Sequence, residues 1–324
     1  MKEDHILYLS RDDVENVNIS MEEIIDSLEE MFIEKGNNRT EMPPKPGLHT
    51  KKDSFIHAMP AYIPKLKSAG LKLVSGYPEN YKFNLPYISG LLVLNNTETG
   101  VPYAVMDCTW LTAMRTGAAT ALAAKYLARS NSEDVGIIGC GVQGRSNLEA
   151  LSCIYDIKKV KAYDISTDAI QVFKNEMEKK LKISIESVSE VKKAVAKMDI
   201  VVTSGPILKN PEPLIENGWF EEGSFASPVD FDSYWKGEVL KGVDKITTDD
   251  IEQFNYYKEH GYFKETPQPF AELGEIIIGK KKGREKEEER IISINLGIAL
   301  EDIAVAPMIY RRALELEIGI ELPL

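Results

Sequence analysis

The chain has 324 residues, 43% of them hydrophobic, and a formal net charge of −12, which is typical of a globular protein of about two domains. Acidic and basic residues are interleaved without a continuous basic face, which argues against nucleic acid as a partner. No apolar run approaches the ~20 residues that cross a bilayer, and the polar start Met1-Lys2-Glu3-Asp4-His5 has no signal-peptide core, so we expect a cytoplasmic protein without a membrane partner.

The first hundred residues predict a small α+β unit. A helix is expected over 21–35. Four runs with strand-like composition follow, at 54–61, 70–76, 88–94 and 103–107. Residues 95–100, Asn-Asn-Thr-Glu-Thr-Gly, have the asparagine and glycine content of a hairpin loop between the last two runs.

An alanine-rich helix is expected over 110–129, and it leads into a region where strand-like and helix-like segments alternate. The expected strands are 134–139, 159–164, 183–188, 199–204, 223–229, 243–248 and 290–295. Amphipathic stretches at 167–181 and 189–198 have apolar residues at helical spacing. This alternation predicts an α/β fold with a Rossmann-type, doubly wound parallel sheet, beside the smaller α+β domain.

The last helix, expected over 300–317, has one apolar face and is predicted to pack back on the N-terminal unit. The predicted domains are therefore a discontinuous one, 1–115 plus 301–324, and a dinucleotide-binding one, 116–300. The charge run 280–290 is interpreted as a solvated loop before the last strand.

Residues 135–144 read Val-Gly-Ile-Ile-Gly-Cys-Gly-Val-Gln-Gly, a strand followed by a glycine turn that opens a helix. Gly139 permits the tight turn, Gly141 lets the backbone approach a pyrophosphate, and Gly144 lets the helix pack close to the strand. Asp164 lies twenty residues after Gly144, the spacing of a carboxylate that binds the adenosine ribose hydroxyls. Because this carboxylate repels a 2′-phosphate and no arginine follows it, the motif predicts NAD rather than NADP as cofactor.

Four charged residues lie in otherwise apolar or conformationally restricted segments. Strand alternation favours solvent for Lys72, and Lys45, held between two prolines, is with equal weight a loop residue or a site residue. Arg115, flanked by small residues, is suited to grip a carboxylate in a bidentate pair, and a structural salt bridge fits nearly as well. Asp230 follows a strand, at the sheet edge where doubly wound folds bind ligands. Together they suggest an amino or keto acid held by its carboxylate near a nicotinamide.

Other chemistries find no support in the sequence. The four histidines and three cysteines lack metal-ligand spacing, so no metal site is predicted. The absence of a Gly-x-Ser-x-Gly elbow and of a lysine-bearing phosphate loop argues against a hydrolase or a nucleoside triphosphatase. The odd number of cysteines argues against a disulfide framework and favours a reducing compartment.

Five short segments occur together in a characteristic order. They are 59–62 (Met-Pro-Ala-Tyr), 72–80 (Lys-Leu-Val-Ser-Gly-Tyr-Pro-Glu-Asn), 115–120 (Arg-Thr-Gly-Ala-Ala-Thr), 139–144 (Gly-Cys-Gly-Val-Gln-Gly) and 296–302 (Leu-Gly-Ile-Ala-Leu-Glu-Asp). By these segments the chain resembles the ornithine cyclodeaminase and mu-crystallin family over nearly its full length. The resemblance implies a homodimer whose N-terminal domain supplies the dimer interface and the substrate pocket. It also implies NAD(P)-dependent chemistry at the α-carbon of a small amino acid.

The resemblance further implies roles for individual residues. Arg115, Lys72 and Lys45 would bind the substrate carboxylate, with Lys72 also near the reacting nitrogen. Asp230 would accept a proton or bind the substrate amine, and His57 would stand at a substrate-binding position. The implied cofactor-contacting residues are Arg115, Thr116, Gly139, Gly141, Val142, Gln143, Gly144, Asp164, Thr203, Ser227 and Asn295.

Three departures from the family pattern affect these roles. Lys45 stands where the family often has an arginine, and a point charge does not reproduce the bidentate fork. His57 stands where an ornithine-cyclising enzyme would have a glutamate, which makes ornithine a poorer expectation. The segment 231–238 after Asp230 is longer and more aromatic than in the family, so Asp232 is a rival for the catalytic role.

The sequence therefore predicts an NAD-dependent amino acid dehydrogenase or imine reductase that acts on a small amino acid, a 2-oxo acid or an imine. Two alternatives stay open. One is ornithine cyclodeaminase, a lyase that converts ornithine to proline and ammonia and regenerates its cofactor in each turnover. The other is a mu-crystallin-like protein that binds the cofactor without efficient catalysis.

Overall fold

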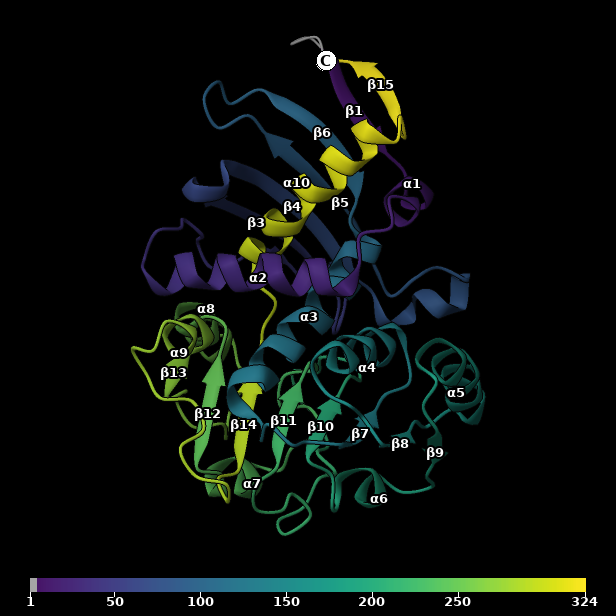
Figure 1. Ribbon diagram of the computed structural model, residues 1–324, viewed down its shortest axis with the longest axis vertical. Coiled ribbons are helices and arrows are strands. Elements are labelled where there is room, and N and C mark those ends of the chain that lie inside the picture. The colour runs from purple at the N-terminus through teal and green to yellow at the C-terminus, as the bar shows by residue number, and fades with distance from the viewer. Residues whose placement is uncertain (1–4) are drawn as a thin grey trace. The chain divides into compact units, whose positions relative to one another are not determined.

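The computed structural model describes residues 5–324 (Figure 1). Met1 to Asp4, on which part of the signal-peptide argument rests, lie outside the described residues. The chain forms two compact units, Met1–Arg115 with Ile298–Leu324, and Thr116–Gly297. None of the helices in residues 5–324 combines the length and the apolar character needed to cross a membrane.

The first unit is built on a seven-stranded sheet in the order β15-β1-β6-β5-β4-β3-β2. Its strands are β1 (His5–Leu9), β2 (Gly47–Leu48), β3 (Phe55–Ile63), β4 (Ser68–Gly76), β5 (Ile88–Asn95), β6 (Pro102–Asp107) and β15 (Ile320–Pro323). Strands β3 to β6 form an antiparallel meander, and β1 joins it in parallel to β6. Strands β1 and β15 were not expected, because each is short and lies at or near the sheet edge.

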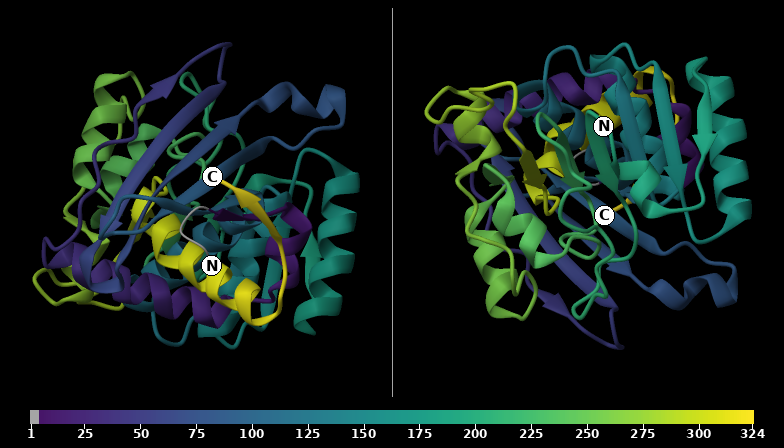
Figure 2. Two further views of the ribbon diagram at one scale, coloured as in Figure 1. Left: turned by 90° about the horizontal axis from the view of Figure 1, so that it is seen from above. Right: turned by 90° about the horizontal axis from the view of Figure 1, so that it is seen from below.

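Two long helices cover one face of this sheet. The helices of the first unit are α1 (Arg11–Asn16), α2 (Met21–Gly36) and α10 (Ala299–Glu315), with single 3-10 turns at η1 (Pro64–Leu66) and η2 (Pro78–Phe83). Ser20 and Glu23 form a capping box that starts α2. Helix α10 packs against α2, β3 and β4 (Figures 1 and 2). Its backbone carbonyl at Ile303 accepts a 2.7 Å hydrogen bond from the Ser68 hydroxyl of β4.

The opposite face of the meander is apolar as well but is not covered by these helices. Leu71 and Leu73 of β4 are 37% and 49% exposed, and Leu91 of β5 is 45% exposed. Leu73 and Leu91 are cross-strand partners, and Leu71 pairs with Val93. A sheet with two apolar faces and one uncovered face is typical of a protein that binds a partner there.

The second unit contains an eight-stranded sheet in the order β13-β12-β14-β11-β10-β7-β8-β9, with every neighbouring pair parallel (Figure 1). The strands are β7 (Asp134–Ile138), β8 (Lys159–Tyr163), β9 (Ile185–Ser187), β10 (Ile200–Thr203), β11 (Phe225–Pro228), β12 (Lys245–Thr248), β13 (Ala271–Glu272) and β14 (Ile291–Ile294). Strands β10, β11 and β14 are buried along their whole length, as expected for parallel strands covered on both faces. The predicted α/β fold with a parallel sheet is confirmed.

The helices of the second unit are α4 (Val142–Ile154), α5 (Thr167–Leu181), α6 (Val191–Val195), α7 (Gly237–Gly242), α8 (Ile251–Glu259) and α9 (Leu273–Ile277). Helix α3 (Thr109–Leu127) crosses the boundary between the units in the sequence. The expected strand 183–188 and helix 189–198 are both shorter than predicted. Helix α8 was not expected, because its apolar residues lie among tyrosines and charged residues that blur the helical period.

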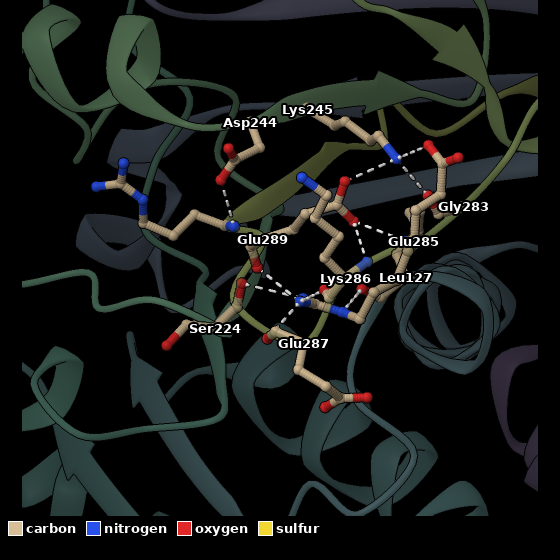
Figure 3. Close-up of polar contacts among 11 residues, drawn as sticks. Leu127, Ser224, Asp244, Lys245, Gly283, Glu285, Lys286, Glu287 and Glu289 are labelled. Atoms are coloured by element: carbon tan, nitrogen blue, oxygen red, sulfur yellow. Dashed lines mark hydrogen bonds and ion pairs between the residues drawn. The ribbon is translucent and has the colours of Figure 1, made fainter.

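The charge run 280–290 is a loop between α9 and β14, but only part of it is solvated. Lys280, Lys281 and Lys282 are exposed. Arg284, in contrast, donates hydrogen bonds to five backbone carbonyls, those of Leu127, Ser224, Lys286, Glu287 and Glu289 (Figure 3). Lys245 reaches Glu285 and Glu289 at 2.8 and 3.0 Å. Residues 284–289 of the run therefore hold the loop against the rest of the second unit.

Candidate active site

The first unit contains a buried cluster of two cations and two carboxylates. Lys72 of β4 is fully buried, and its Nζ lies 2.6 Å from Asp302 Oδ2 and 3.4 Å from Thr112 Oγ1. The expectation that Lys72 faces solvent is therefore wrong. Alternation along β4 is inverted, because the flanking Leu71 and Leu73 occupy the uncovered apolar face while Lys72 turns toward a carboxylate of α10.

Arg115 is the second cation of this cluster and is 5% exposed. Its Nη1 donates to Glu301 Oε2 at 2.5 Å, and its Nε donates to Asp302 Oδ1 at 3.1 Å. Glu301 and Asp302 lie in the first turn of α10, where carboxylates are favoured by the helix dipole. Asp302 thus bridges both cations and fixes their side chains relative to each other.

His57 and Lys45 lie in the same unit, and both are 7% exposed. Burial, followed by the positive charge of Lys45 and by His49 and Lys72, lowers the pKa of His57 to about 3. The imidazole is therefore neutral at physiological pH. Burial and the charge of Arg115 also lower the pKa of Lys72, and Asp302 opposes this shift. The surroundings of His57 therefore carry a positive potential.

The second unit contains the glycine turn between β7 and α4. Gly139 has a φ of +96°, and a Cβ there would lie 2.7 Å from the carbonyl oxygen of Ser204. A Cβ at Gly144 would lie 2.2 Å from the carbonyl oxygen of Gly139, so this helix and turn approach as the motif requires. Gly141 is the N-cap of α4, so no side chain caps the first N–H groups of this helix. A Cβ at Gly141 would meet nothing within 4 Å. This open cradle at a helix N-terminus fits a pyrophosphate.

The residues next to the cradle include three that the sequence predicted to contact the cofactor, Val142, Gln143 and Asp164. Val142 is 62% exposed at the start of α4, and Gln143 follows it. Asp164 lies directly after β8, where its Oδ2 accepts from the backbone N–H of Cys140 at 2.7 Å and its Oδ1 from that of Ser166 at 2.9 Å. The carboxylate therefore holds the glycine turn itself, in addition to any contact with a ribose.

Asp230 lies two residues beyond β11 and is fully buried. Its Oδ1 accepts from the Thr203 hydroxyl at 2.8 Å and its Oδ2 from the Gly205 N–H at 2.9 Å. Because the indole N–H of Trp235 donates to the Thr203 oxygen at 3.2 Å, the Thr203 proton is directed at Asp230. Burial raises the pKa of Asp230 to about 7, although both hydrogen bonds favour the ionised form. Such a carboxyl is suited to exchange protons near neutral pH.

The other expected site residues differ in their surroundings. Asp232 accepts from the Thr266 hydroxyl at 2.9 Å, and burial raises its pKa. Ser227 is buried with its hydroxyl 2.8 Å from that of Thr120. Asn295 follows β14 and has a buried Nδ2 with no hydrogen-bond partner in residues 5–324, which leaves one amide donor available at this sheet edge. Thr116 follows Arg115 directly on α3.

Comparison with known proteins places the whole chain in one group. A model of the ornithine cyclodeaminase/mu-crystallin family matches residues 5–317. The chain belongs to this family. An alanine dehydrogenase from Archaeoglobus fulgidus is 38% identical over 323 residues, which cover 97% of each chain. The family prediction made from the five sequence segments is confirmed.

Two solved structures share the fold and more than a third of the sequence. A Δ1-pyrroline-2-carboxylate reductase from Thermococcus litoralis, in complex with NADH and L-proline, is 36% identical with a TM-score of 0.88, covering 97% of this chain and 99% of that one. An archaeal alanine dehydrogenase dimer with bound NAD is also 36% identical with a TM-score of 0.88, covering 99% of both chains.

Three residues were given no role in the sequence analysis, although they contact candidate site residues: Glu301 and Asp302 beside Lys72 and Arg115, and Trp235 beside Thr203. Glu301 and Asp302 belonged to a family-like segment, but nothing in the sequence showed that they pair with Lys72 and Arg115. The indole of Trp235, which orients Thr203, lies in the segment 231–238 that the sequence marked only as unusual. An acidic pair in the first turn of a helix was the one available signal.

Proposed function

We propose that the protein is an NAD-dependent oxidoreductase that acts on the C–N bond of a small α-amino acid, as an amino acid dehydrogenase or an imine reductase. The observation that carries the proposal is the buried cluster of Lys72 and Arg115 in a chain that also holds a dinucleotide cradle. The comparisons confirm the reaction class, because the relatives include an alanine dehydrogenase and a pyrroline-2-carboxylate reductase. Both solved relatives contain NAD or NADH, the cofactor predicted from Asp164.

In this proposal Arg115, Lys72 and Lys45 bind the substrate carboxylate. The two cations and two carboxylates of the cluster balance each other, and Lys45, whose charge acts on His57 together with that of Lys72, adds one net positive charge for one substrate carboxylate. Asp302 and Glu301 hold the cations in place before the substrate arrives, which lowers the entropy lost on binding. A substrate with a single carboxylate completes the charge balance of the cluster.

Proton transfer is assigned to Asp230. Its raised pKa lets it take a proton during amine oxidation and return it during imine reduction. Thr203 and Gly205 keep the carboxylate in one orientation. The glycine turn, the start of α4, Asp164 and Asn295 would hold NAD(H), with Arg115, Thr116, Thr203 and Ser227 as further expected contacts. When bound, the nicotinamide supplies the hydride exchange that this chain's side chains cannot perform.

The surroundings of His57 favour a dehydrogenase or reductase over an ornithine cyclodeaminase. A diamino acid brings a distal ammonium, which needs a carboxylate partner when it is buried. His57 instead stays neutral because burial and the nearby cations disfavour its protonation. An ammonium in the same surroundings meets the same repulsion. Small apolar, keto or cyclic imino substrates avoid it.

An assay of the purified protein with amino acids, 2-oxo acids plus an amine, and cyclic imines tests the proposal. We expect an absorbance change of NADH with at least one monocarboxylic substrate. Ornithine that yields proline and ammonia without net NADH would establish the cyclodeaminase instead. Tight NADH binding without turnover of any substrate would support a mu-crystallin-like binding protein.

The negative charge of Asp164 should set the cofactor preference. Asp164→Asn keeps an oxygen for the Cys140 N–H but removes the charge that repels a 2′-phosphate. We expect the ratio of kcat/KM for NADPH to that for NADH to rise roughly tenfold, as expected for ~1.4 kcal/mol of lost repulsion. Asp168→Asn, an exposed acid in the first turn of α5, is the matched control and should leave the ratio unchanged. An unchanged ratio in Asp164→Asn would remove Asp164 from the cofactor site.

We also propose that the protein is a homodimer joined through the uncovered face of the meander β3 to β6. The alanine dehydrogenase relative is described as a dimer. Leu71, Leu73 and Leu91 form a contiguous exposed apolar patch on two adjacent strands, and a second copy is a partner with the same apolar character. Cys108, Cys140 and Cys153 form no disulfide within residues 5–324, which suits a cytoplasmic location, the one that we propose.

Leu73→Glu should convert the dimer into a monomer. A carboxylate on each copy would be buried without a partner, a loss of several kcal/mol across the two copies. Light scattering after gel filtration should show a fall from twice the chain mass of 36.3 kDa to the single-chain value. Val172→Glu, at an exposed valine of α5 that is 46% exposed, is the control and should leave the mass unchanged. A variant Leu73→Glu that stays dimeric would place the interface elsewhere.

A further inference from the structure

Tyr234 lies in the segment 231–238 that follows Asp230 and departs from the family pattern, and two buried aromatic residues of this segment, Phe231 and Trp235, hold it in place. Phe231 has a φ of +64°, a conformation rare for a bulky residue, and its ring packs 4.9 Å from that of Phe263. At the other end Trp235 is 2% exposed and bonds to Thr203. A strained backbone held by buried rings at both ends presents Tyr234 in a fixed position.

The ring of Tyr234 lies directly on Gly205. A Cβ built on this glycine would be 2.5 Å from Tyr234 Cε2 and 2.7 Å from its Oη. The N–H of Gly205 donates to Asp230, and the hydroxyl of the preceding Ser204 donates to the carbonyl oxygen of Gly139 at 2.8 Å. Tyr234 is therefore linked through two residues to both the proposed proton acceptor and the glycine turn. No residue in 5–324 forms a hydrogen bond with its hydroxyl.

The electrostatic surroundings agree with this position. Burial, followed by the charges of Asp230 and Asp164 and by Tyr163, raises the pKa of Tyr234 to about 12. The phenol is therefore protonated in any ordinary assay and can both donate and accept a hydrogen bond. Asp164 and Asp230 mark the two ends of the path proposed for the cofactor. The charges of both carboxylates act on the Tyr234 hydroxyl, in agreement with its position over Gly205 between them.

We propose that Tyr234 is a dinucleotide-binding residue whose hydroxyl hydrogen-bonds the sugar–phosphate backbone of NAD(H). The inference rests on the proposed cofactor and adds a residue from the segment in which this chain departs from its family. It also explains why residue 205 is a glycine, since any side chain there would displace the ring of Tyr234. Ligands in doubly wound folds bind beyond the carboxyl ends of the strands, which is where Gly205 and Asp230 lie.

Tyr234→Phe removes only the hydroxyl and tests the proposal by binding rather than by activity. The probes are NADH and ADP-ribose, which has the whole sugar–phosphate backbone but no nicotinamide, measured by titration calorimetry. We expect both dissociation constants to rise by the same factor, roughly 3- to 10-fold, the effect of one lost hydrogen bond. The melting temperature of the ligand-free variant should stay at the wild-type value, because no internal hydrogen bond is lost.

Tyr155→Phe is the matched control. Tyr155 follows α4 at the end remote from the glycine turn, and its hydroxyl donates to the Ala124 carbonyl at 2.8 Å. This variant should melt at a lower temperature but bind both probes normally. Wild-type affinity in Tyr234→Phe, or a loss confined to NADH, would overturn the proposed contact. A wild-type protein that does not bind NADH would contradict the proposed function itself.

Discussion

Replacing Asp230 by asparagine should lower kcat for amino acid oxidation by roughly 10²- to 10⁴-fold, the range for loss of a general base. Asparagine has the same shape and keeps an oxygen for the Thr203 hydroxyl, but it cannot accept a proton from the substrate. Binding of NADH should stay within about a factor of three, which is under 1 kcal/mol. Steady-state kinetics with NADH titration separates the two effects.

The pH dependence gives a second check on the same variant. Because the pKa of Asp230 is raised to about 7, kcat/KM for oxidation by the wild-type protein should rise as the pH increases through 7. Reduction of the imine needs the protonated form and should fall over the same interval. Asp230→Asn should lose both dependences. A variant that keeps the wild-type profile would show that another group transfers the proton.

Asp230 should also affect stability in the opposite direction to most carboxylates. The folded carboxyl keeps its proton up to about pH 7, whereas an unfolded one loses it near 3.8. The folded state therefore binds the extra proton in this window, and the contribution of Asp230 to the free energy of unfolding decreases as the pH rises from 3.8 to 7. Denaturant titrations of Asp230→Asn should lack this decrease.

Asp232→Asn is the control that separates the two rival carboxylates. Asp232 accepts a hydrogen bond from Thr266 and lines a small cavity with Lys209 and Lys264, and within residues 5–324 it forms no hydrogen bond with Thr203 or Gly205. We expect less than a tenfold loss of kcat from this change, under ~1.4 kcal/mol. A larger loss in Asp232→Asn than in Asp230→Asn would exchange their roles.

The parts of the fold that could be predicted from the sequence are those whose signal is local. The turn at Gly139 to Gly144 depends on backbone space, which only glycine provides, so the residue types themselves indicate the geometry. The parallel strands of the second unit are short apolar runs between helices, and their residue types likewise indicate their position in the fold. Strands β1 and β15 are short, β15 is exposed along its whole length, and their pairing joins segments more than 300 residues apart in the sequence.

The candidate site was harder to predict because its contacts are not local. Arg115 and Asp302 are 187 residues apart, and only the folded chain shows that one carboxylate bridges two cations. Lys72 was assigned to the wrong face, because alternation assumes that leucines are inside and charges outside. Here the leucines form the uncovered face and the lysine has a buried partner. Tyr234 and Trp235 belong to a segment whose residue types indicate packing but not its direction.

Replacing Arg115 by lysine should lower kcat/KM for the amino acid by about 100-fold or more, equivalent to ~3 kcal/mol, mainly through KM. Lysine keeps the charge but has a single nitrogen in place of the planar fork that joins Nε to Asp302 and Nη1 to Glu301, so it cannot hold both carboxylates in this geometry and also bind the substrate carboxylate. Affinity for NADH should change less than KM for the amino acid, because Arg115 is only one of the expected cofactor contacts and the glycine turn and Asp164 stay intact. Arg312→Lys, at a half-exposed arginine paired with Glu23 at 2.8 Å, is the control and should leave KM unchanged.

A loss of folding would imitate this loss of binding, because Arg115→Lys leaves the buried Glu301 carboxylate without its 2.5 Å partner. The double variant Arg115→Lys with Glu301→Gln removes the buried carboxylate charge that loses this hydrogen bond. We expect it to recover most of the lost melting temperature but not the KM for the amino acid, since the bidentate fork is still missing. If KM recovers together with the melting temperature, Arg115 is a structural partner of Glu301 and not a substrate ligand. If neither recovers, the contact with Asp302 is the one that orders the cluster.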